Sequence, residues 1–237
     1  MDATTITTDS TAPAPFSGLK RRFYRVIAAD PASHFKSYTA VQSQNPQSRR
    51  DSQRHYATTS FAELAALPVR DLASPDGAHL FLWTSGPFLP QAFKLIGAWG
   101  FEYSSIAFVW VKTYRGWDGH SPLYEFRTVG LRKSDFPIGL GLTTRSQCEI
   151  VLLARRGNCR RRCKKVRQLI LAARRQHSRK PNRFYTSVEQ YAQGPYADLF
   201  ARERRPGWDC WGWEVDKFTT APEREQNERK GQMELPL

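Results

Sequence analysis

Short apolar runs alternate with helical patterns along most of the chain, and this alternation limits the folds that are possible. The runs lie at residues 25–29, 78–83, 103–111, 148–154 and 166–172. Polar or turn residues bound each run, which is typical of buried strands. Residues 87–99 instead place apolar side chains at helical spacing and end at Gly100, a residue that suits a helix C-terminus. The pattern predicts an α/β fold with a mostly parallel, doubly wound sheet and helices on both faces.

Two further patterns refine this prediction. Ser60 and Glu63 form a capping box, so we expect a helix from there to about Leu67. Long polar stretches at 31–55 and 113–147 each follow a predicted strand. Loops of this length inside a compact domain are usually functional or disordered, and both can cover the same edge of the sheet.

The segment 174–214 is the most informative part of the chain. A basic loop precedes Pro181, which suits the first turn of a helix that we expect to run to about Tyr191, before Gly194-Pro195. Residues 198–202 then predict a short buried strand that ends on a charged residue, followed by a loop rich in Gly and Trp. Because ligands bind at the carboxyl ends of strands in open α/β sheets, we expect Lys180 and Arg202 to meet at one edge.

The positive charge is concentrated in one part of the sequence. The formal net charge is +14, and residues 155–180 hold twelve Lys and Arg but no acidic residue. Such a cluster can be a solvated face, but its density is typical of a protein that binds nucleic acid. The candidate phosphate contacts are Arg160, Arg161, Arg162, Lys164 and Lys165.

Length and composition predict one domain at residues 21–218, between a disordered leader at 1–20 and a disordered charged tail at 219–237. No apolar run is long enough for a membrane span and no signal peptide is recognisable, so we expect a cytoplasmic protein. The four cysteines fit no common zinc pattern. Cys159, Cys163 and His177 could form a metal site, but reduced thiols are the favoured interpretation and no metal is expected. The sequence also lacks a glycine-rich fingerprint for NAD.

An ordered series of motifs runs through residues 23–215. The motifs include Ala29-Asp30-Pro31, His55-Tyr56, Leu82-Trp83, Trp110-Val111-Lys112, Ser178-Arg179-Lys180-Pro181, Leu199–Arg202 and Gly207-Trp208. In this order they resemble the AdoMet-dependent N6-adenine methyltransferases related to the catalytic subunit of the mRNA N6-adenosine methyltransferase. The resemblance is strongest to bacterial and phage single-domain members. It implies a Rossmann-like methyltransferase domain that uses S-adenosyl-L-methionine (AdoMet) and modifies adenine in DNA rather than RNA, in a bacterial or phage-infected cell.

The resemblance also implies roles for residues on the substrate side. Asp30 and Pro31 correspond to the positions that accept hydrogen bonds from the adenine amine, and Ala29 precedes them. Ser33 stands where the family has a stacking tryptophan, and Ala32 replaces a proline. Because a base–aromatic stack contributes roughly 1–3 kcal/mol, its loss weakens binding of a flipped base without abolishing it. The other candidates for the base pocket are Phe35, Tyr38, Tyr56, Trp83, Trp110, Lys112 and Glu149. Core packing is an equally good interpretation of Trp83 and Trp110.

On the cofactor side, Lys180 and Arg202 correspond to family residues that contact the amino-acid and ribose portions of AdoMet. The remaining candidates are His177, Ser178, Arg204, Arg205, Trp213 and Glu214. Trp213 stands where the family usually has Asn, which can both donate to and accept from ribose hydroxyls, whereas tryptophan only donates.

These departures leave three hypotheses open. The chain is an active N6-adenine methyltransferase, a non-catalytic nucleic-acid-binding subunit or scaffold, or an enzyme that installs a different group on adenine. A homodimer or heterodimer is compatible with each hypothesis.

Overall fold

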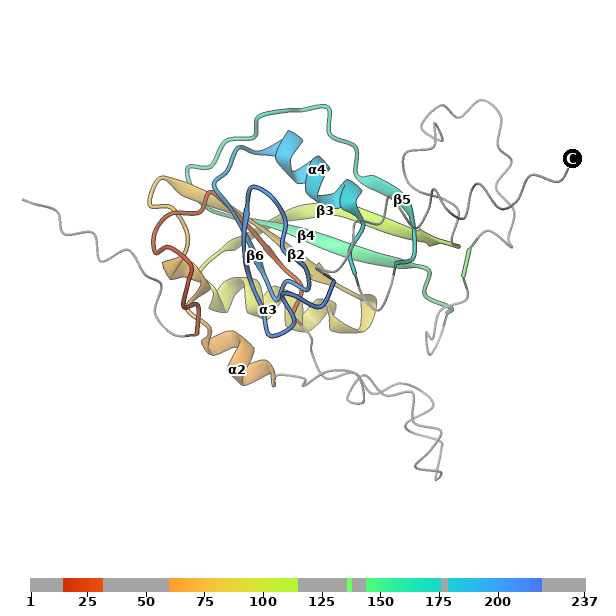
Figure 1. Cartoon of the computed structure of the whole chain (residues 1–237), viewed down its shortest axis with the longest axis horizontal. Helices are drawn as coiled ribbons and strands as arrows, with labels where there is room; N and C mark the ends of the chain where they lie inside the picture. The colour runs from red at the N-terminus through yellow and green to blue at the C-terminus, as the bar shows by residue number, and fades with distance from the viewer. Residues whose placement is uncertain (1–14, 32–59, 115–135, 138–143, 176–178, 219–237) are drawn as a thin grey trace, which may run out of the picture.

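The computed structural model describes residues 15–31, 60–114, 136–137, 144–175 and 179–218 (Figure 1). The strands are β1 (Val26–Ala29), β2 (Gly77–Thr84), β3 (Glu102–Thr113), β4 (Cys148–Gly157), β5 (Leu169–Ala173), β6 (Tyr196–Leu199) and β7 (Trp208–Trp211). The α-helices are α2 (Phe61–Ala66), α3 (Leu89–Ala98) and α4 (Asn182–Tyr191), and short 3-10 turns occupy Val69–Asp71 and Gly86–Phe88. No helix in these ranges is long and apolar enough to cross a membrane.

A seven-stranded sheet with the order β5-β3-β4-β2-β1-β6-β7 organises the domain. β4 is antiparallel to both of its neighbours, β2 and β3, whereas every other pairing is parallel. The carboxyl ends of six strands and the amino end of β4 therefore lie at one edge. We call it the Asp30 edge, and we call the opposite edge, where β4 ends at Gly157, the Gly157 edge.

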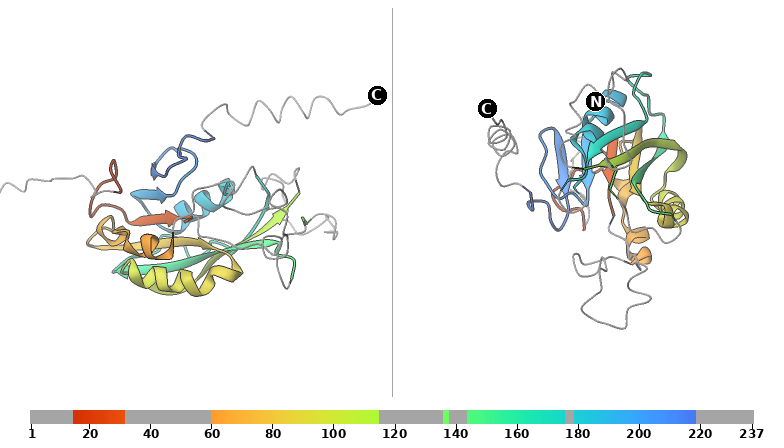
Figure 2. Two further views of the ribbon diagram at one scale, coloured as in Figure 1. Left: turned by 90° about the horizontal axis from the view of Figure 1, so that it is seen from below. Right: turned by 90° about the vertical axis from the view of Figure 1, so that its right-hand side faces the viewer.

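Helices cover both faces of the sheet (Figure 2). On one face, Leu64 of α2 and Leu95 and Ile96 of α3 pack in one apolar cluster with the alternate residues Leu80 and Leu82 of β2. On the other face, α4 packs in a second cluster that contains Phe81, Trp83, Phe108 and Trp110. The prediction of a mostly parallel sheet with helices on both faces is confirmed.

Local predictions for several elements are also confirmed. The Ser60 hydroxyl accepts from the Glu63 N–H (3.3 Å) and the Glu63 carboxylate accepts from the Ser60 N–H (2.8 Å), so the capping box forms. Gly100 has φ = 75°, the left-handed conformation expected after α3. The predicted helix after Pro181 forms as α4.

The structure differs from the sequence predictions at three places. β6 ends at Leu199 rather than Arg202, because Phe200 has φ = 64° and turns the chain out of the sheet. Residues 208–211, which we expected in a loop, form β7 through parallel pairing with β6. Phe16 and Leu19 are buried in the core, so the packed part of the chain begins before the expected boundary at residue 21.

Phe184 provides a test of this packing. Its side chain is fully buried and its ring contacts Phe81, Trp83 and Phe108 at centroid distances of 6.3, 4.8 and 5.9 Å. We expect Phe184→Ala to lower the free energy of unfolding by about 3–5 kcal/mol, because it removes the residue that seats α4 on the sheet. Gln190→Ala, an exposed change on the same helix, should shift it by less than about 0.5 kcal/mol in denaturant titrations. Equal effects would contradict this role for Phe184.

Candidate active site

Four charged side chains meet at the Asp30 edge. Asp30 directly follows β1, Lys180 precedes α4, and Lys112 lies near the end of β3. Glu149 is the second residue of β4 and reaches the same edge because β4 runs antiparallel to its neighbours. The Lys180 ammonium lies 3.1 Å from Asp30 Oδ1 and 2.6 Å from Glu149 Oε2, and the Lys112 ammonium lies 2.5 Å from Glu149 Oε1.

Burial makes this group of charges interdependent. Only 7% of the Lys180 side chain is exposed, and burial alone would lower its pKa. The carboxylates of Asp30 and Glu149 outweigh burial and raise the pKa of Lys180. Burial likewise acts to raise the pKa of Glu149, but the ammonium groups of Lys180 and Lys112 hold it at about 2. Two cations and two carboxylates thus balance each other at the edge.

Trp83 and Trp110 form a buried layer beside these charges. Their rings meet edge to face with centroids 6.1 Å apart, and their residues are 4% and 1% exposed. The Lys180 ammonium lies 4.6 Å from the ring centroid of Trp83, and the Lys112 ammonium lies 5.2 Å from that of Trp110. These contacts favour the core-packing interpretation, with the two rings supporting the lysines through cation–π interactions.

The chain around β6 and β7 forms the neighbouring part of this edge. The Arg202 guanidinium lies 3.8 Å from the Glu214 carboxylate. Gly212, which follows β7, approaches the chain that follows β6 so closely that a Cβ on Gly212 would lie 2.4 Å from the Ala201 carbonyl oxygen. The Trp213 ring contacts the rings of Phe200 and Trp211, but the residue is 70% exposed, so its ring is not buried in the core.

A second buried network links this loop to α4, and our sequence analysis did not predict it. Glu203 pairs with Arg205 (2.5 Å), with Arg179 and, at 3.9 Å, with Arg175. Arg205 also lies 3.8 Å from the centroid of the Tyr185 ring. The only sequence signal is the single acidic residue among the arginines at residues 202–205, which does not specify partners at or before α4.

Asp198 is the acidic group at the centre of this network. It lies on β6, is 6% exposed, and accepts a hydrogen bond of 2.8 Å from the Tyr185 hydroxyl. Burial raises the pKa of Asp198 to about 7, with help from the nearby carboxylates of Asp30 and Glu203 and against the opposing effects of Tyr185 and Arg205. Burial also raises the pKa of Tyr185 well above its ordinary value.

The structure brings together some predicted site residues and separates others. Asp30, Lys112, Glu149 and Lys180 meet at one point, as described above. Arg204 instead lies on the surface, where it pairs with Asp216 at 2.7 Å, and it joins neither network. The predicted residues Ser33, Phe35, Tyr38, Tyr56, His177 and Ser178 lie outside the described residues.

The basic segment 160–165 lies away from the Asp30 edge. It belongs to the connection from β4 to β5, which passes over α4 (Figure 1). The Arg162 N–H donates to the Tyr191 carbonyl at the C-terminal end of α4, whereas Lys180 precedes the N-terminal end. The ten residues of α4 correspond to a helix length of about 15 Å, which separates Arg162 from Lys180. The five basic side chains are exposed, and their contact with phosphates stays a prediction. Within the described ranges no group of His, Cys, Asp or Glu could hold a metal ion.

Two comparisons with known proteins bear on this site. Residues 24–214 match the model of the MT-A70 family. The chain is also 32% identical over 213 residues to the type II methyltransferase M.MunI from Mycoplasma sp. That alignment covers 84% of this chain and 81% of the relative. The family match includes Asp30, Glu149, Lys180 and the β6–β7 loop in one continuous unit.

Replacement of the Glu149 carboxylate tests the buried charge balance. Glu149→Gln leaves Lys112 without its carboxylate and Lys180 with Asp30 alone, so we expect the free energy of unfolding to fall by about 3 kcal/mol. The matched change Asp216→Asn breaks the exposed pair with Arg204 and should cost less than about 1 kcal/mol in the same denaturant titration. If the two variants lose equal stability, the Glu149 centre contributes no more than a surface ion pair.

Asp198 predicts a specific pH dependence of stability. Its pKa is raised in the folded state from 3.8 to about 7, so the folded protein binds a proton that the unfolded chain has lost. The contribution of Asp198 to the free energy of unfolding should therefore fall by roughly 3–4 kcal/mol as the pH rises from about 4 to 7, whereas the contribution of His79, whose pKa burial lowers to about 4, should rise over the same range. Asp198→Asn keeps an acceptor for Tyr185 and should remove this fall.

The control for this experiment is Asp209→Asn. Asp209 also accepts from a tyrosine hydroxyl, that of Tyr24 at 2.7 Å, but it is exposed. Its replacement should leave the slope of stability against pH between 4 and 7 unchanged. A parent-like slope in Asp198→Asn would show that Asp198 titrates normally.

Proposed function

The chain belongs to the MT-A70 family, and from this premise we propose that it is an AdoMet-dependent methyltransferase that modifies the N6 amine of adenine in DNA. The observation that carries the proposal is the position of Asp30, at the carboxyl end of β1, ion-paired with Lys180 and still 24% exposed. The relative M.MunI is a type II methyltransferase, and this similarity supports methyl transfer to DNA.

Asp30 has the chemistry that this reaction needs. The adenine amine is a poor nucleophile because its lone pair is delocalised into the ring. A carboxylate has about four lone-pair sites, so Asp30 can keep its contact with Lys180 and still accept from an amine N–H. The Pro31 carbonyl is the second proposed acceptor. Together they would favour a tetrahedral nitrogen and stabilise the positive charge that develops on it during transfer.

Lys180 and Glu149 hold Asp30 in position for this role. Lys180 crosses from the start of α4 to the end of β1, and Glu149 anchors the same ammonium from β4. This arrangement fixes the Asp30 carboxylate from two other elements of the fold. A carboxylate fixed in advance by its neighbours needs little reorganisation when charge develops.

The residues around this centre fit the portions of AdoMet. The Lys180 ammonium has three donors and uses two on Asp30 and Glu149, so one stays available for the carboxylate of the cofactor. Arg202 and Glu214 present a donor and an acceptor suited to ribose hydroxyls. The close approach of Gly212 to the Ala201 backbone holds the chain after β6 against the chain after β7 and so keeps Arg202 near Glu214. When bound, AdoMet would supply an electrophilic methyl group on its sulfonium.

The position of Trp213 favours an enzyme over a scaffold without a cofactor. A tryptophan packed inward at this point would close the ribose region. Its ring instead rests on Phe200 and Trp211 and stays 70% exposed. The exposed ring is therefore compatible with a bound nucleoside.

The Asp30 carboxylate is the direct test. We expect Asp30→Asn to lower N6-methyladenine in DNA from cells that produce the chain by at least about 100-fold, because an amide donates where an acceptor is required. The readout is mass analysis of nucleosides, which would also detect a different group on adenine. The control Asp76→Asn removes an exposed carboxylate from the turn before β2 and should leave the yield of N6-methyladenine unchanged.

Two further measurements make the result interpretable. Asp30→Asn removes one of the two carboxylates that pair with buried Lys180, so its unfolding temperature should fall, but the variant should stay folded in the assay and bind DNA like the parent chain. A variant that retains full methylation would exclude Asp30 as the acceptor. A parent chain that neither methylates DNA nor binds AdoMet in calorimetry would favour the scaffold hypothesis.

A further inference from the structure

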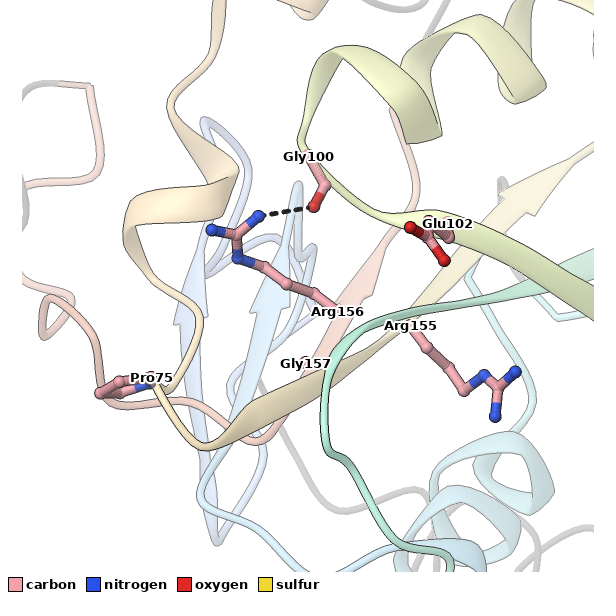
Figure 3. Close-up of a pocket in the computed structure, with 6 residues that line it drawn as sticks. All are labelled: Pro75, Gly100, Glu102, Arg155, Arg156 and Gly157. Carbon is pink, nitrogen blue, oxygen red and sulfur yellow. Dashed lines mark hydrogen bonds between the residues drawn. The ribbon is translucent and has the colours of Figure 1, made fainter.

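The Gly157 edge carries two adjacent hollows lined by arginine. The larger, of about 530 Å³, lies between the turn into β3 and the end of β4, with Arg155 and Arg156 at its wall (Figure 3). The smaller, of about 260 Å³, lies beside it and is lined by Arg21, Arg22 and Arg70. Arg156 and Pro75 line both hollows, so the two form one continuous surface.

Positive charge is in excess on this surface. Its acidic residues are Asp71 and Glu102, and Asp71 is shared between Arg21 (3.8 Å) and Arg70 (3.6 Å). Among the described residues, no carboxylate forms an ion pair with Arg22, Arg155 or Arg156. An arginine guanidinium binds phosphate through two parallel N–H groups, which favours it over lysine for phosphate recognition.

The backbone of this edge holds Arg156 in place. Its Nη1 donates to the Gly100 carbonyl oxygen at 2.8 Å, across from β4 to the turn after α3 (Figure 3). Gly157 has φ = 64°, and Gly77 approaches residue 158 so closely that a Cβ would lie 2.8 Å from its backbone. The tight turn and the hydrogen bond fix one nitrogen of the guanidinium and leave the others for a ligand.

Neighbouring side chains extend the positive surface around the sheet. Arg155 and Arg156 are successive residues of β4, so their side chains lie on opposite faces of the sheet. On the Arg155 face, burial lowers the pKa of His79 to about 4, and the positive charge of Arg155 adds to this effect. From there the exposed residues 160–165 continue the basic surface past the end of α4. At the Asp30 edge, by contrast, Lys112 and Lys180 are neutralised by carboxylates.

The two edges are too far apart to bind the same few phosphates. Glu149 and Arg156 are seven residues apart along β4, which corresponds to roughly 23 Å at about 3.3 Å per residue. A duplex of about 12 base pairs with its target in the centre extends about 20 Å to either side. A duplex of that length, centred at Asp30 and aligned with β4, ends level with Arg155 and about 3 Å short of the Arg156 backbone, so most phosphates near this surface belong to DNA beyond it.

We propose that the arginine surface of the Gly157 edge binds the phosphodiester backbone of a second segment of duplex DNA, which lies outside the roughly 12 base pairs centred on the adenine at Asp30. The proposal rests on the proposed function only in naming DNA as the common ligand. Binding of a second segment tethers the protein to long DNA and raises the effective concentration of target sites near Asp30. The advantage applies to long DNA alone.

The test removes Arg22 and Arg155, two of the three exposed arginines that form no ion pair with a carboxylate among the described residues, in the variant Arg22→Gln/Arg155→Gln. Binding to duplex DNA of several hundred base pairs is measured against salt concentration. The log–log slope should fall by about 1.8, at about 0.9 for each lost phosphate contact, so that the loss of affinity between about 50 and 200 mM salt shrinks about tenfold. Lys94→Gln removes an exposed charge from the middle of α3 and should leave the slope unchanged.

Methyl transfer on two lengths of DNA separates the second segment from the first. With the target sequence on a duplex of about 12 base pairs, the double variant should match the parent in kcat and KM. On long DNA, its KM should rise several-fold at constant kcat. An equal rise on both lengths would overturn the proposal, because both sets of phosphates would then belong to one segment.

The binding measurement keeps this proposal independent of the proposed function. An unchanged slope in the double variant means that the arginines form a solvated face, whatever the enzyme activity. A reduced slope in a chain that transfers no methyl group would support the DNA surface and contradict the methyltransferase proposal alone. If the double variant has a lowered unfolding temperature, the single change Arg22→Gln is measured in its place, with an expected loss of about 0.9 in slope.

Discussion

The buried ammonium of Lys180 is the contact on which the arrangement of the Asp30 edge depends. It joins the end of β1, the beginning of β4 and the start of α4 through Asp30 and Glu149. An ammonium this deeply buried is stable only when its charge is matched, and the two carboxylates supply that match. The requirement explains why β4 runs against its neighbours in an otherwise parallel sheet: its amino end brings Glu149 to the edge where the other strands end.

The distribution of charge makes the two edges of the sheet electrostatically different. At the Asp30 edge the cations are neutralised, so a neutral purine base can enter without displacing a bound anion. At the Gly157 edge and beyond α4, exposed arginines face solvent, and within the described part of the chain no carboxylate pairs with Arg22, Arg155 or Arg156. For a DNA enzyme this division has a physical advantage, because backbone contacts supply affinity at one edge while the paired charges of the Asp30 edge serve the chemistry. The net charge of +14 therefore describes the surface far from the chemistry more than the site itself.

The sequence by itself determined most of the α/β framework and the central residues of the site. Apolar runs bounded by turn residues located β1 to β5, and the helix stop signals located α3 and α4, because these patterns depend on burial and on local backbone geometry. Asp30 and Lys180 were identified by motifs whose residue types the chemistry requires. The resemblance, rather than any periodicity, placed Glu149 near Lys112, and the structure joins the two at 2.5 Å.

Only the tertiary structure decided the features that depend on partners distant in the sequence. The four residues of β7 become a strand because β6 pairs with them, and Phe200 turns the chain away before Arg202 despite its apolar neighbours. The three arginines around Glu203 come from segments that a linear charge pattern cannot match. The arginine surface of the Gly157 edge likewise combines residues 21–22, 70 and 155–156. Charge can be counted along a chain, but its neutralisation depends on distances that exist only after the sheet has assembled.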